Sequence, residues 1–309
     1  MHIGFLGLGK MGKRMVEKLV LEGHAVVAWN RNFTVGEDLR EELRSKNYAL
    51  RIEKEIKDIF SSSESPHVFW LMLPAGEVTE SVLQELKKFI KKGDVVIDGA
   101  NSFYEDTQRR SEEFALAGIE FLGIGVSGGI LAPDNGFPLM VGGSETGYEK
   151  VKPLLDSLAK PRGGHAYFGK GGAGHYIKMI HNGIEYGMMQ AIGEGFGVLD
   201  KGPYKIDLEK VADLWNKNTI ISSFLIDRAK DALKKDAHLD ATVGFIEENG
   251  EAKWTIALAK KLQVPIHVTE DSLKFRQESQ KNPEIQKTFA AKMVAALRHE
   301  FGGHKVKEK

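Results

Sequence analysis

The sequence predicts an α/β domain built on a doubly wound parallel sheet, followed by an all-α domain. In the first half of the chain, short apolar runs alternate with amphipathic stretches, whereas after about Gly171 the runs of strand length stop. Parallel strands need long crossovers, and helical crossovers cover both faces of the sheet. We therefore expect a first domain over residues 1–171 and a second domain over residues 172–309.

Six apolar runs in the first half have the length and composition of buried strands. They are residues 3–8, 25–29, 68–73, 95–97, 121–125 and 139–141. In the second half, residues 174–201 contain no proline and carry apolar residues at helical spacing, which predicts one helix of roughly 40 Å at 1.5 Å per residue. Further helices are expected at residues 208–217, 220–235, 250–262, 266–280 and 283–301, and a tail at residues 302–309.

The composition excludes several classes of function. The 43 basic side chains equal the 43 acidic ones in number, so we expect no nucleic-acid or membrane partner. The absence of cysteine excludes disulfides, cysteine-ligated zinc and thiol nucleophiles. No apolar run approaches the roughly 20 residues that a bilayer requires, and the first residues do not look like a leader. We expect a cytoplasmic protein.

A glycine-rich motif directly follows the first predicted strand and opens a predicted helix, and it reads Gly7-Leu8-Gly9-Lys10-Met11-Gly12. In this context Gly7 allows a tight turn, Gly9 lets a pyrophosphate approach the backbone, and Gly12 allows helix and strand to pack closely. The helix N-terminus adds N–H groups and positive potential. We interpret the motif as the dinucleotide-binding loop of a Rossmann-type domain; a glycine turn without a ligand is the alternative.

The second predicted strand ends at Asn30-Arg31-Asn32, where an NAD enzyme usually places a carboxylate on the ribose hydroxyls. The Arg31 guanidinium can pair with a 2′-phosphate, and Asn30 and Asn32 can add hydrogen bonds without repelling it. This pattern favours NADP over NAD as the cofactor. The alternative is that Arg31 is simply solvated.

Four polar residues of the long predicted helix, Lys178, His181, Asn182 and Glu185, share one face because they recur at intervals of three and four. Their segment is otherwise apolar and rich in glycine, so we expect the face to line a cleft, with a solvated face as the alternative. Loss of hydration in a cleft disfavours the charged form of a lysine, which would make Lys178 a useful general base.

Two loops follow predicted strands at the edge where open α/β sheets bind ligands. Residues 98–102 carry Asn101, and Ser127-Gly128-Gly129 exposes backbone N–H groups that can hold a carboxylate. A plain glycine turn is the alternative for each loop alone.

Three runs of residues, 97–102, 125–129 and 178–186, together resemble the signatures of the 6-phosphogluconate dehydrogenase family. The similarity extends through Asp106-Thr107, Arg109-Arg110, Lys253-Trp254-Thr255, Arg276 and residues 298–304, so it covers nearly the whole chain. The chain is shorter than the long form of the family, and residues 73–75 and 130–133 depart from the long-form sequence. These departures bear on oligomer contacts and on details of the cofactor loop.

The resemblance implies oxidative decarboxylation of 6-phosphogluconate to ribulose 5-phosphate and CO2 with reduction of NADP and without a metal, in the pentose phosphate pathway. Lys178 would accept the C3 hydroxyl proton and then return a proton to the new carbonyl oxygen. Asn182 would bind the C3 oxygen, and Glu185 would protonate C1 of the enediol that remains after loss of CO2.

The resemblance also implies the binding residues and the assembly. The carboxylate and hydroxyls of the phosphosugar acid would contact Asn101, Ser127, Gly128, Gly129 and His181, and its phosphate would contact Tyr186, Lys253, Thr255, Arg276, Arg298 and His304. The cofactor would also contact Leu73, Pro74, Ala75 and Asn101. A homodimer or a dimer of dimers is expected, with the tail that carries Arg298 and His304 reaching the partner's site. The alternative function is a reductase of a small non-phosphorylated β-hydroxyacid, which would have no use for Lys253 or Arg276.

Overall fold

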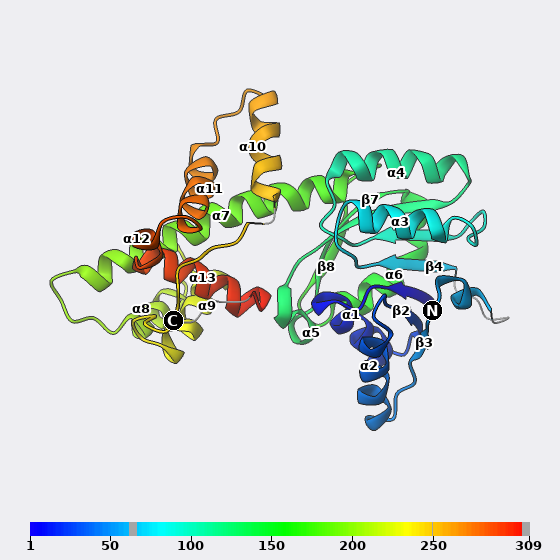
Figure 1. Cartoon of the computed structure of the whole chain (residues 1–309), viewed down its shortest axis with the longest axis horizontal. Helices are drawn as coiled ribbons and strands as arrows, with labels where there is room; N and C mark the ends of the chain where they lie inside the picture. The colour runs from blue at the N-terminus through cyan, green and yellow to red at the C-terminus, as the bar shows by residue number, and fades with distance from the viewer. Residues whose placement is uncertain (62–66, 249, 305–309) are drawn as a thin grey trace. The chain divides into compact units, whose positions relative to one another are not determined.

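The computed structural model describes residues 1–61, 67–248 and 250–304 of the chain (Figure 1). The chain divides into two compact units, Met1–Lys178 and Met179–Lys309. The division falls inside one long helix, α7 (Ala173–Lys201), and not at residues 171 and 172, where the sequence places the boundary. Residues 305–309 of the predicted tail lie outside the described residues.

The first unit contains an eight-stranded sheet with the order β3-β2-β1-β4-β5-β6-β7-β8. The strands are β1 (His2–Leu6), β2 (Ala25–Trp29), β3 (Arg51–Glu53), β4 (Val68–Leu71), β5 (Val95–Asp98), β6 (Glu120–Val126), β7 (Pro138–Gly143) and β8 (Gly164–Tyr167). Neighbouring strands are parallel except for β6 and β7, which are antiparallel. The predicted α/β class is confirmed.

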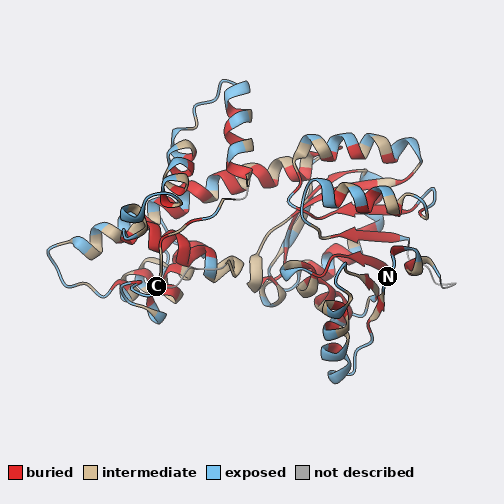
Figure 2. Ribbon diagram, viewed as in Figure 1, coloured by how far each residue is buried: buried red, intermediate tan, exposed pale blue. Residues whose placement is uncertain are grey.

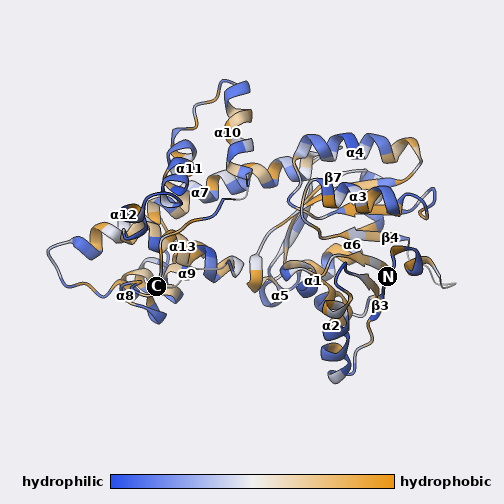
Figure 3. Cartoon of the chain, viewed as in Figure 1, coloured by the Kyte–Doolittle hydropathy of each residue, from blue (hydrophilic) through white to orange (hydrophobic). Residues whose placement is uncertain are grey.

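Helices cover both faces of this sheet. The faces pack against two apolar cores, one with α1 (Lys10–Leu21), α2 (Phe33–Ser45) and α6 (Glu145–Ala159), the other with α3 (Glu77–Leu86) and α4 (Tyr104–Leu116) (Figure 1). The central strands β4 and β5 are buried along their length, and all their residues except Asp98 are apolar (Figures 2 and 3). Burial on both faces is why each predicted strand appears as a continuous apolar run.

The sheet departs from the predicted parallel arrangement at one pair, because β7 runs antiparallel to β6. The segment that joins β6 to β7 contains only η2 (Gly129–Leu131) and α5 (Ala132–Asn135), and neither is long enough to carry the chain back across the sheet. Two strands, β3 and β8, were not predicted. They are edge strands, and both contain charged or polar residues, so they do not form apolar runs.

The second unit is helical throughout its described residues. After α7 it contains α8 (Leu208–Trp215), α9 (Phe224–Lys235), α10 (Glu251–Lys261), α11 (His267–Ser279), α12 (Pro283–Gln286) and α13 (Phe289–Gly302). Two boundaries differ from the prediction because side-chain caps intervene. The Ser223 hydroxyl accepts from the Ile226 N–H at the start of α9, and the Thr288 hydroxyl accepts from the Ala291 N–H and begins a new helix, α13.

Glycines in α7 allow other parts of the second unit to approach it closely. A β-carbon at Gly183 would lie 2.8 Å from Cγ2 of Thr255, and one at Gly193 would lie 2.8 Å from the carbonyl oxygen of Ala290. The close packing compensates for the cost of glycine in a helix, which is about 1 kcal/mol relative to alanine. No helix among the described residues is both long and apolar enough to cross a membrane.

Candidate active site

The glycine-rich loop joins β1 to α1 in the first unit. Gly7 has φ +105°, and a β-carbon there would overlap the carbonyl oxygen of Met72. A β-carbon at Gly12 would overlap the carbonyl oxygen of Gly7, whereas one at Gly9 would meet nothing within 4 Å. The backbone before α1 is therefore open at Gly9, where the helix N-terminus offers N–H groups to a phosphate. This geometry fits a dinucleotide pyrophosphate.

The side chains of Asn30 and Asn32 are used within the fold. Asn30 Oδ1 accepts from the Leu8 N–H at 2.9 Å, and Asn30 Nδ2 donates to the Asn32 carbonyl at 2.8 Å. Asn32 Oδ1 accepts from the Thr34 N–H and caps α2. These bonds hold the end of β2 against the glycine loop and reduce what either amide can offer a ligand. Arg31 is exposed and makes no ion pair with any described residue, so it remains the candidate for a 2′-phosphate.

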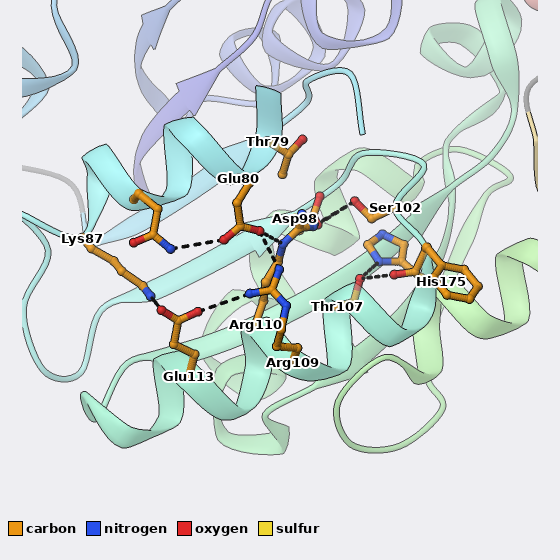
Figure 4. A network of polar contacts seen from close by, with 12 residues as sticks. Thr79, Glu80, Lys87, Asp98, Ser102, Thr107, Arg109, Arg110, Glu113 and His175 are labelled. Atoms are coloured by element: carbon orange, nitrogen blue, oxygen red, sulfur yellow. Dashed lines mark hydrogen bonds and ion pairs between the residues drawn. The ribbon is translucent and has the colours of Figure 1, made fainter. Parts of the chain in front are cut away.

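A fully buried carboxylate, Asp98, shapes the loop that carries Asn101 (Figure 4). Asp98 lies at the end of β5 and accepts from the Ala100 N–H at 3.1 Å and from the Ser102 hydroxyl at 2.8 Å. Arg110 of α4, also buried, donates to Asp98 Oδ2 at 2.9 Å. The buried contacts of Asp98 therefore fix the conformation of the loop, whereas Asn101 in the same loop is exposed.

Arg110 also joins α4 to α3. Its Nε donates to Glu80 Oε2 at 3.0 Å, and Arg109 donates to the same oxygen at 2.7 Å. Partial burial works to raise the pKa of Glu80, but hydrogen bonds from Arg109, Gln84 and Arg110 outweigh it and lower that pKa to about 2. The sequence does not predict this network, because charged residues far apart in a sequence carry no signal that they pair.

The second loop, Ser127-Gly128-Gly129, follows β6. The Ser127 N–H donates to the carbonyl of Pro138 at 2.9 Å, which leaves the Ser127 hydroxyl and the N–H groups of Gly128 and Gly129 as candidate donors. Both glycines have positive φ, +96° and +58°. The short helix α5, which follows this loop, is bound to α1, because Lys18 Nζ donates to the carbonyl of Pro133 at 3.0 Å.

Lys178 lies in the first turns of α7, next to β6. A β-carbon at Gly125 would overlap Cβ of Lys178, so the absence of a side chain at Gly125 lets the helix contact the strand directly. Lys178 is 8% exposed. The first unit therefore places Lys178 at the carboxyl end of β6, where the Ser127 loop begins. Leu73, Pro74 and Ala75 follow β4 at the same edge of the sheet.

The predicted polar face of α7 continues into the second unit. His181 Nδ1 lies 2.9 Å from Asn182 Oδ1 and 3.9 Å from Glu185 Oε2. Asn182 is buried, whereas His181 and Glu185 are partly exposed. His181 therefore contacts both Asn182 and Glu185, as their helical spacing predicts.

Two buried arginines lie close together in the second unit. The guanidinium carbon of Arg276 is 3.3 Å from the centre of the Tyr186 ring, and no carboxylate of the described residues lies within 4 Å of this side chain. Burial lowers the pKa of Arg276 to about 10, and the charge of Arg298 contributes to the decrease. Burial also lowers the pKa of Arg298. Two desolvated cations in one place form a candidate site for an anion.

The remaining predicted phosphate ligands have other contacts. Lys253 is exposed and pairs with Glu248. The Thr255 hydroxyl lies 2.9 Å from the carbonyl oxygens of Met179 and Glu251, so its hydrogen is already engaged where α10 packs on α7. The carbonyl of His304 accepts from His299 Nδ1. Among the described residues, no group of three or more His, Asp or Glu side chains could hold a metal ion.

Comparison with known families explains this arrangement. A model of the NAD binding domain of 6-phosphogluconate dehydrogenase matches residues 2–172, and a model of the C-terminal domain of the same enzyme matches residues 174–309. The chain belongs to the 6-phosphogluconate dehydrogenase family. The resemblance inferred from the sequence is confirmed, and the first unit is the NAD(P)-binding domain of an oxidoreductase.

Individual relatives cover the chain to different extents. It is 40% identical over 309 residues to YqeC of Bacillus subtilis, with both chains covered completely. It is 34% identical over 312 residues to the NAD(+)-dependent, decarboxylating 6-phosphogluconate dehydrogenase of Haloferax volcanii, covering 100% of this chain and 99% of that one. The solved structure of Plasmodium falciparum 6-phosphogluconate dehydrogenase is 30% identical with a TM-score of 0.82. The match covers 91% of this chain but only 62% of the Plasmodium chain.

Proposed function

We propose that the protein oxidises and decarboxylates 6-phosphogluconate to ribulose 5-phosphate and CO2 with reduction of NADP, as a step of the pentose phosphate pathway. One observation carries this proposal beyond membership of the family. Arg276 is buried on Tyr186 without a carboxylate partner among the described residues, and Arg298 lies near enough to lower its pKa.

Burying two like charges is unfavourable unless a ligand compensates for it. A phosphate dianion compensates two guanidinium groups at once and accepts bidentate hydrogen bonds from each. A small β-hydroxyacid carries a single carboxylate, which would bind the Ser127 loop and would offer Arg276 no ion-pair partner. The buried pair therefore favours a phosphorylated substrate over the alternative reductase function.

For the first step, we assign the general base to Lys178. Bound nicotinamide supplies the hydride acceptor for C3 of the substrate. Lys178 Nζ accepts the proton of the C3 hydroxyl as the hydride leaves, and Asn182 orients the C3 oxygen by a hydrogen bond. Asn101 binds the neighbouring hydroxyl, and the Ser127 loop holds the carboxylate.

The same lysine serves the second step. Oxidation leaves a β-keto acid, and protonated Lys178 stabilises negative charge that develops on its carbonyl oxygen. The bond to the carboxylate breaks, CO2 leaves, and its electron pair forms an enediol. Lys178 donates its proton to the carbonyl oxygen in this step. Glu185 then donates a proton to C1 of the enediol while Lys178 takes back the hydroxyl proton at C2, which yields the ketone of ribulose 5-phosphate.

NADP is the proposed cofactor because Arg31 is exposed beside the glycine loop and no carboxylate stands at the end of β2. The family contains both preferences: the Haloferax volcanii relative is named NAD(+)-dependent, and the Plasmodium falciparum enzyme was solved with NADP+. In this chain the preference for NADP over NAD is therefore assigned to Arg31 alone, since the side chains of Asn30 and Asn32 form hydrogen bonds within the protein.

A homodimer or a dimer of dimers is the proposed assembly. Several large apolar side chains of the second unit are exposed, including Tyr204, Leu214, Ile220 and Phe224. Apolar surface of this kind is typical of an interface between subunits. The assembly would appear in sedimentation velocity at low micromolar concentration, and a monomer at that concentration would contradict it.

The activity is tested by following NADP reduction and CO2 release with 6-phosphogluconate, gluconate and 3-hydroxyisobutyrate as substrates. We expect turnover and CO2 with 6-phosphogluconate, and a much lower kcat/KM with gluconate, which lacks only the phosphate. Preferential turnover of 3-hydroxyisobutyrate without CO2 would contradict the proposal.

A further inference from the structure

The first turn of α7 packs directly against the sheet of the first unit, without intervening side chains at Gly174. A β-carbon at Gly174 would overlap the carbonyl oxygens of Gly123 and Met140, and one at Gly125 would overlap Cβ of Lys178. These contacts involve backbone atoms and the β-carbon of Lys178. No flexible side chain of the described residues lies between the helix and the strand that could move to accommodate a displaced helix. A displacement of the turn therefore displaces Lys178 directly.

Within this turn, His175 forms a second attachment. The ring is 1% exposed, and its Nδ1 lies 2.7 Å from the hydroxyl oxygen of Thr107, which is fully buried in α4 (Figure 4). His175 precedes Lys178 by three residues, which is close to one helical turn, so the two residues share a side of α7. The Thr107–His175 bond therefore anchors α4 to the part of α7 that holds the lysine.

The same helix, α4, holds the Asn101 loop. Arg110 follows Thr107 by three residues, lies on the same side of α4, and donates to the buried carboxylate of Asp98 (Figure 4). One face of α4 thus contacts the loop that carries Asn101 through Arg110, and the turn that carries Lys178 through Thr107. Both contacts are buried, so water does not compete with them.

The surroundings keep His175 neutral. Burial lowers the pKa of His175; the carboxylate of Asp98 works against this effect, and the cation of Arg110 adds to it. A neutral imidazole next to Lys178 does not repel the protonated lysine. It acts on the lysine only through the position of the helix.

We propose that His175 is a positioning residue for Lys178, and that its bond to Thr107 couples the lysine to the Asn101 loop through α4. This inference rests on the proposed function, because it requires Lys178 to act on the substrate. His175 itself need not touch the substrate or the cofactor.

Removing either partner tests the proposal. We expect Thr107→Val and His175→Leu each to lower kcat by about tenfold or more, because a small misplacement of a catalytic group has large effects, while KM for NADP stays unchanged. The double variant should be no worse than either single variant, since both remove one interaction. Thr107→Ser and His175→Asn, which retain polar atoms at these positions, should recover part of the loss.

The first unit offers a matched control. His24 Nε2 lies 2.8 Å from the Ser157 hydroxyl, so the variant Ser157→Ala also breaks a histidine–hydroxyl bond, which is partly buried and lies away from α7. We expect it to lower Tm while leaving kcat unchanged. The proposal is overturned if Thr107→Val lowers Tm to a similar extent with wild-type kcat, or if the effects of the two single variants multiply in the double variant.

Hydrogen exchange separates this inference from the proposed function. If the wild-type protein does not turn over 6-phosphogluconate, the proposed function is wrong. The Thr107–His175 attachment is then tested by the hydrogen-exchange rates of the backbone amides of residues 176–179. These amides should exchange faster in Thr107→Val than in Ser157→Ala. Equal exchange in the two variants would overturn the anchoring.

Discussion

The Arg276 guanidinium carbon lies 3.3 Å from the centre of the Tyr186 ring, and the arginine is 2% exposed. The ring partly compensates the buried charge, as a desolvated cation–π contact does by about 2 kcal/mol. We expect Arg276→Met to raise KM for 6-phosphogluconate by about tenfold to a hundredfold, since a charge-assisted phosphate contact is worth about 1.5–3 kcal/mol. KM for NADP should not change.

Arg228 provides a matched control for this prediction. It also lies over an aromatic ring, that of Phe224 at 5.2 Å, but it pairs with Asp227 and Asp231. Arg228→Met should lower Tm because Asp231 loses the cation that it pairs with and Asp227 keeps only Lys230, and it should not change KM. Arg276→Met should lower Tm less, because it removes a buried charge that has no carboxylate partner among the described residues. The reverse order of stability effects would contradict a ligand role for Arg276.

Lys178→Met is expected to abolish both oxidation and decarboxylation, because one amine serves both steps. Loss of a general base lowers kcat by at least about a hundredfold. The affinity for NADP, measured by fluorescence titration, should stay the same because the glycine loop lies on another element. A variant that retains more than about a hundredth of wild-type turnover would show that another group is the base.

Arg31→Asp is expected to shift the preference from NADP toward NAD. A carboxylate repels the 2′-phosphate of NADP and accepts hydrogen bonds from the ribose hydroxyls of NAD. The measurement is kcat/KM for both cofactors in wild type and variant. Asn30 must remain unchanged, since it bonds to the Leu8 N–H and its loss would disturb the glycine loop. An unchanged ratio would mean that Arg31 is only solvated.

The sequence could predict the parts of the fold that leave a local signal. Buried parallel strands appear as apolar runs, and the glycines at positions 7, 9 and 12 follow the first of them at a fixed spacing, so both were found. The strands β3 and β8 lie at the edges and lack such a signal. The direction of β7 depends on the absence of a crossover, which is visible only once the short η2 and α5 are known.

In the candidate site, too, the sequence could predict only what local geometry determines. The intervals between Lys178, Asn182 and Glu185 indicate a shared face because helical geometry is local. The pairing of Asp98 with Arg110 and of Thr107 with His175 depends on how α4 packs on β5 and α7, and no spacing rule describes that packing. For the same reason, the sequence could not show that the hydroxyl of Thr255 is already engaged by backbone carbonyls.

Glu80 makes the stability of the first unit depend on pH. Its pKa is about 2 in the folded chain, against an ordinary value of 4.5, so the unfolded chain takes up the proton first as pH falls. The contribution of Glu80 is therefore complete above pH 4.5 and is lost between pH 4.5 and 2. We expect Glu80→Gln to be less stable than wild type at pH 7, with a shallower loss of stability over that acidic range.

Urea unfolding at pH 7, 4 and 3 measures this dependence. Glu77→Gln is the control, because Glu77 lies exposed in the same helix and makes no ion pair with the described residues. If Glu80→Gln and wild type lose stability in parallel below pH 4.5, the contacts of Glu80 with Arg109 and Arg110 do not stabilise the folded chain.

The final prediction concerns which chain uses Arg298. The resemblance implies that the tail carrying Arg298 reaches the partner's site, whereas contacts within one chain indicate a different arrangement for Arg298 itself. Arg298 is buried in α13 of the second unit, and its charge lowers the pKa of Arg276 in the same chain. We therefore expect Arg298 to bind the phosphate of a substrate held by its own Arg276.

Co-refolding two inactive or weak variants distinguishes the two arrangements. A chain with Arg298→Met is mixed with a chain with Lys178→Met, and differently sized tags show that mixed dimers form. If Arg298 acts within its own chain, every site in the mixed dimer lacks either Lys178 or Arg298, so activity stays as low as in the separate variants. If Arg298 acted on the partner's substrate, one site of each mixed dimer would contain both residues, and activity would return. Point substitution is used here, because truncation from Arg298 onward would also remove Phe301, which packs against the core of the second unit.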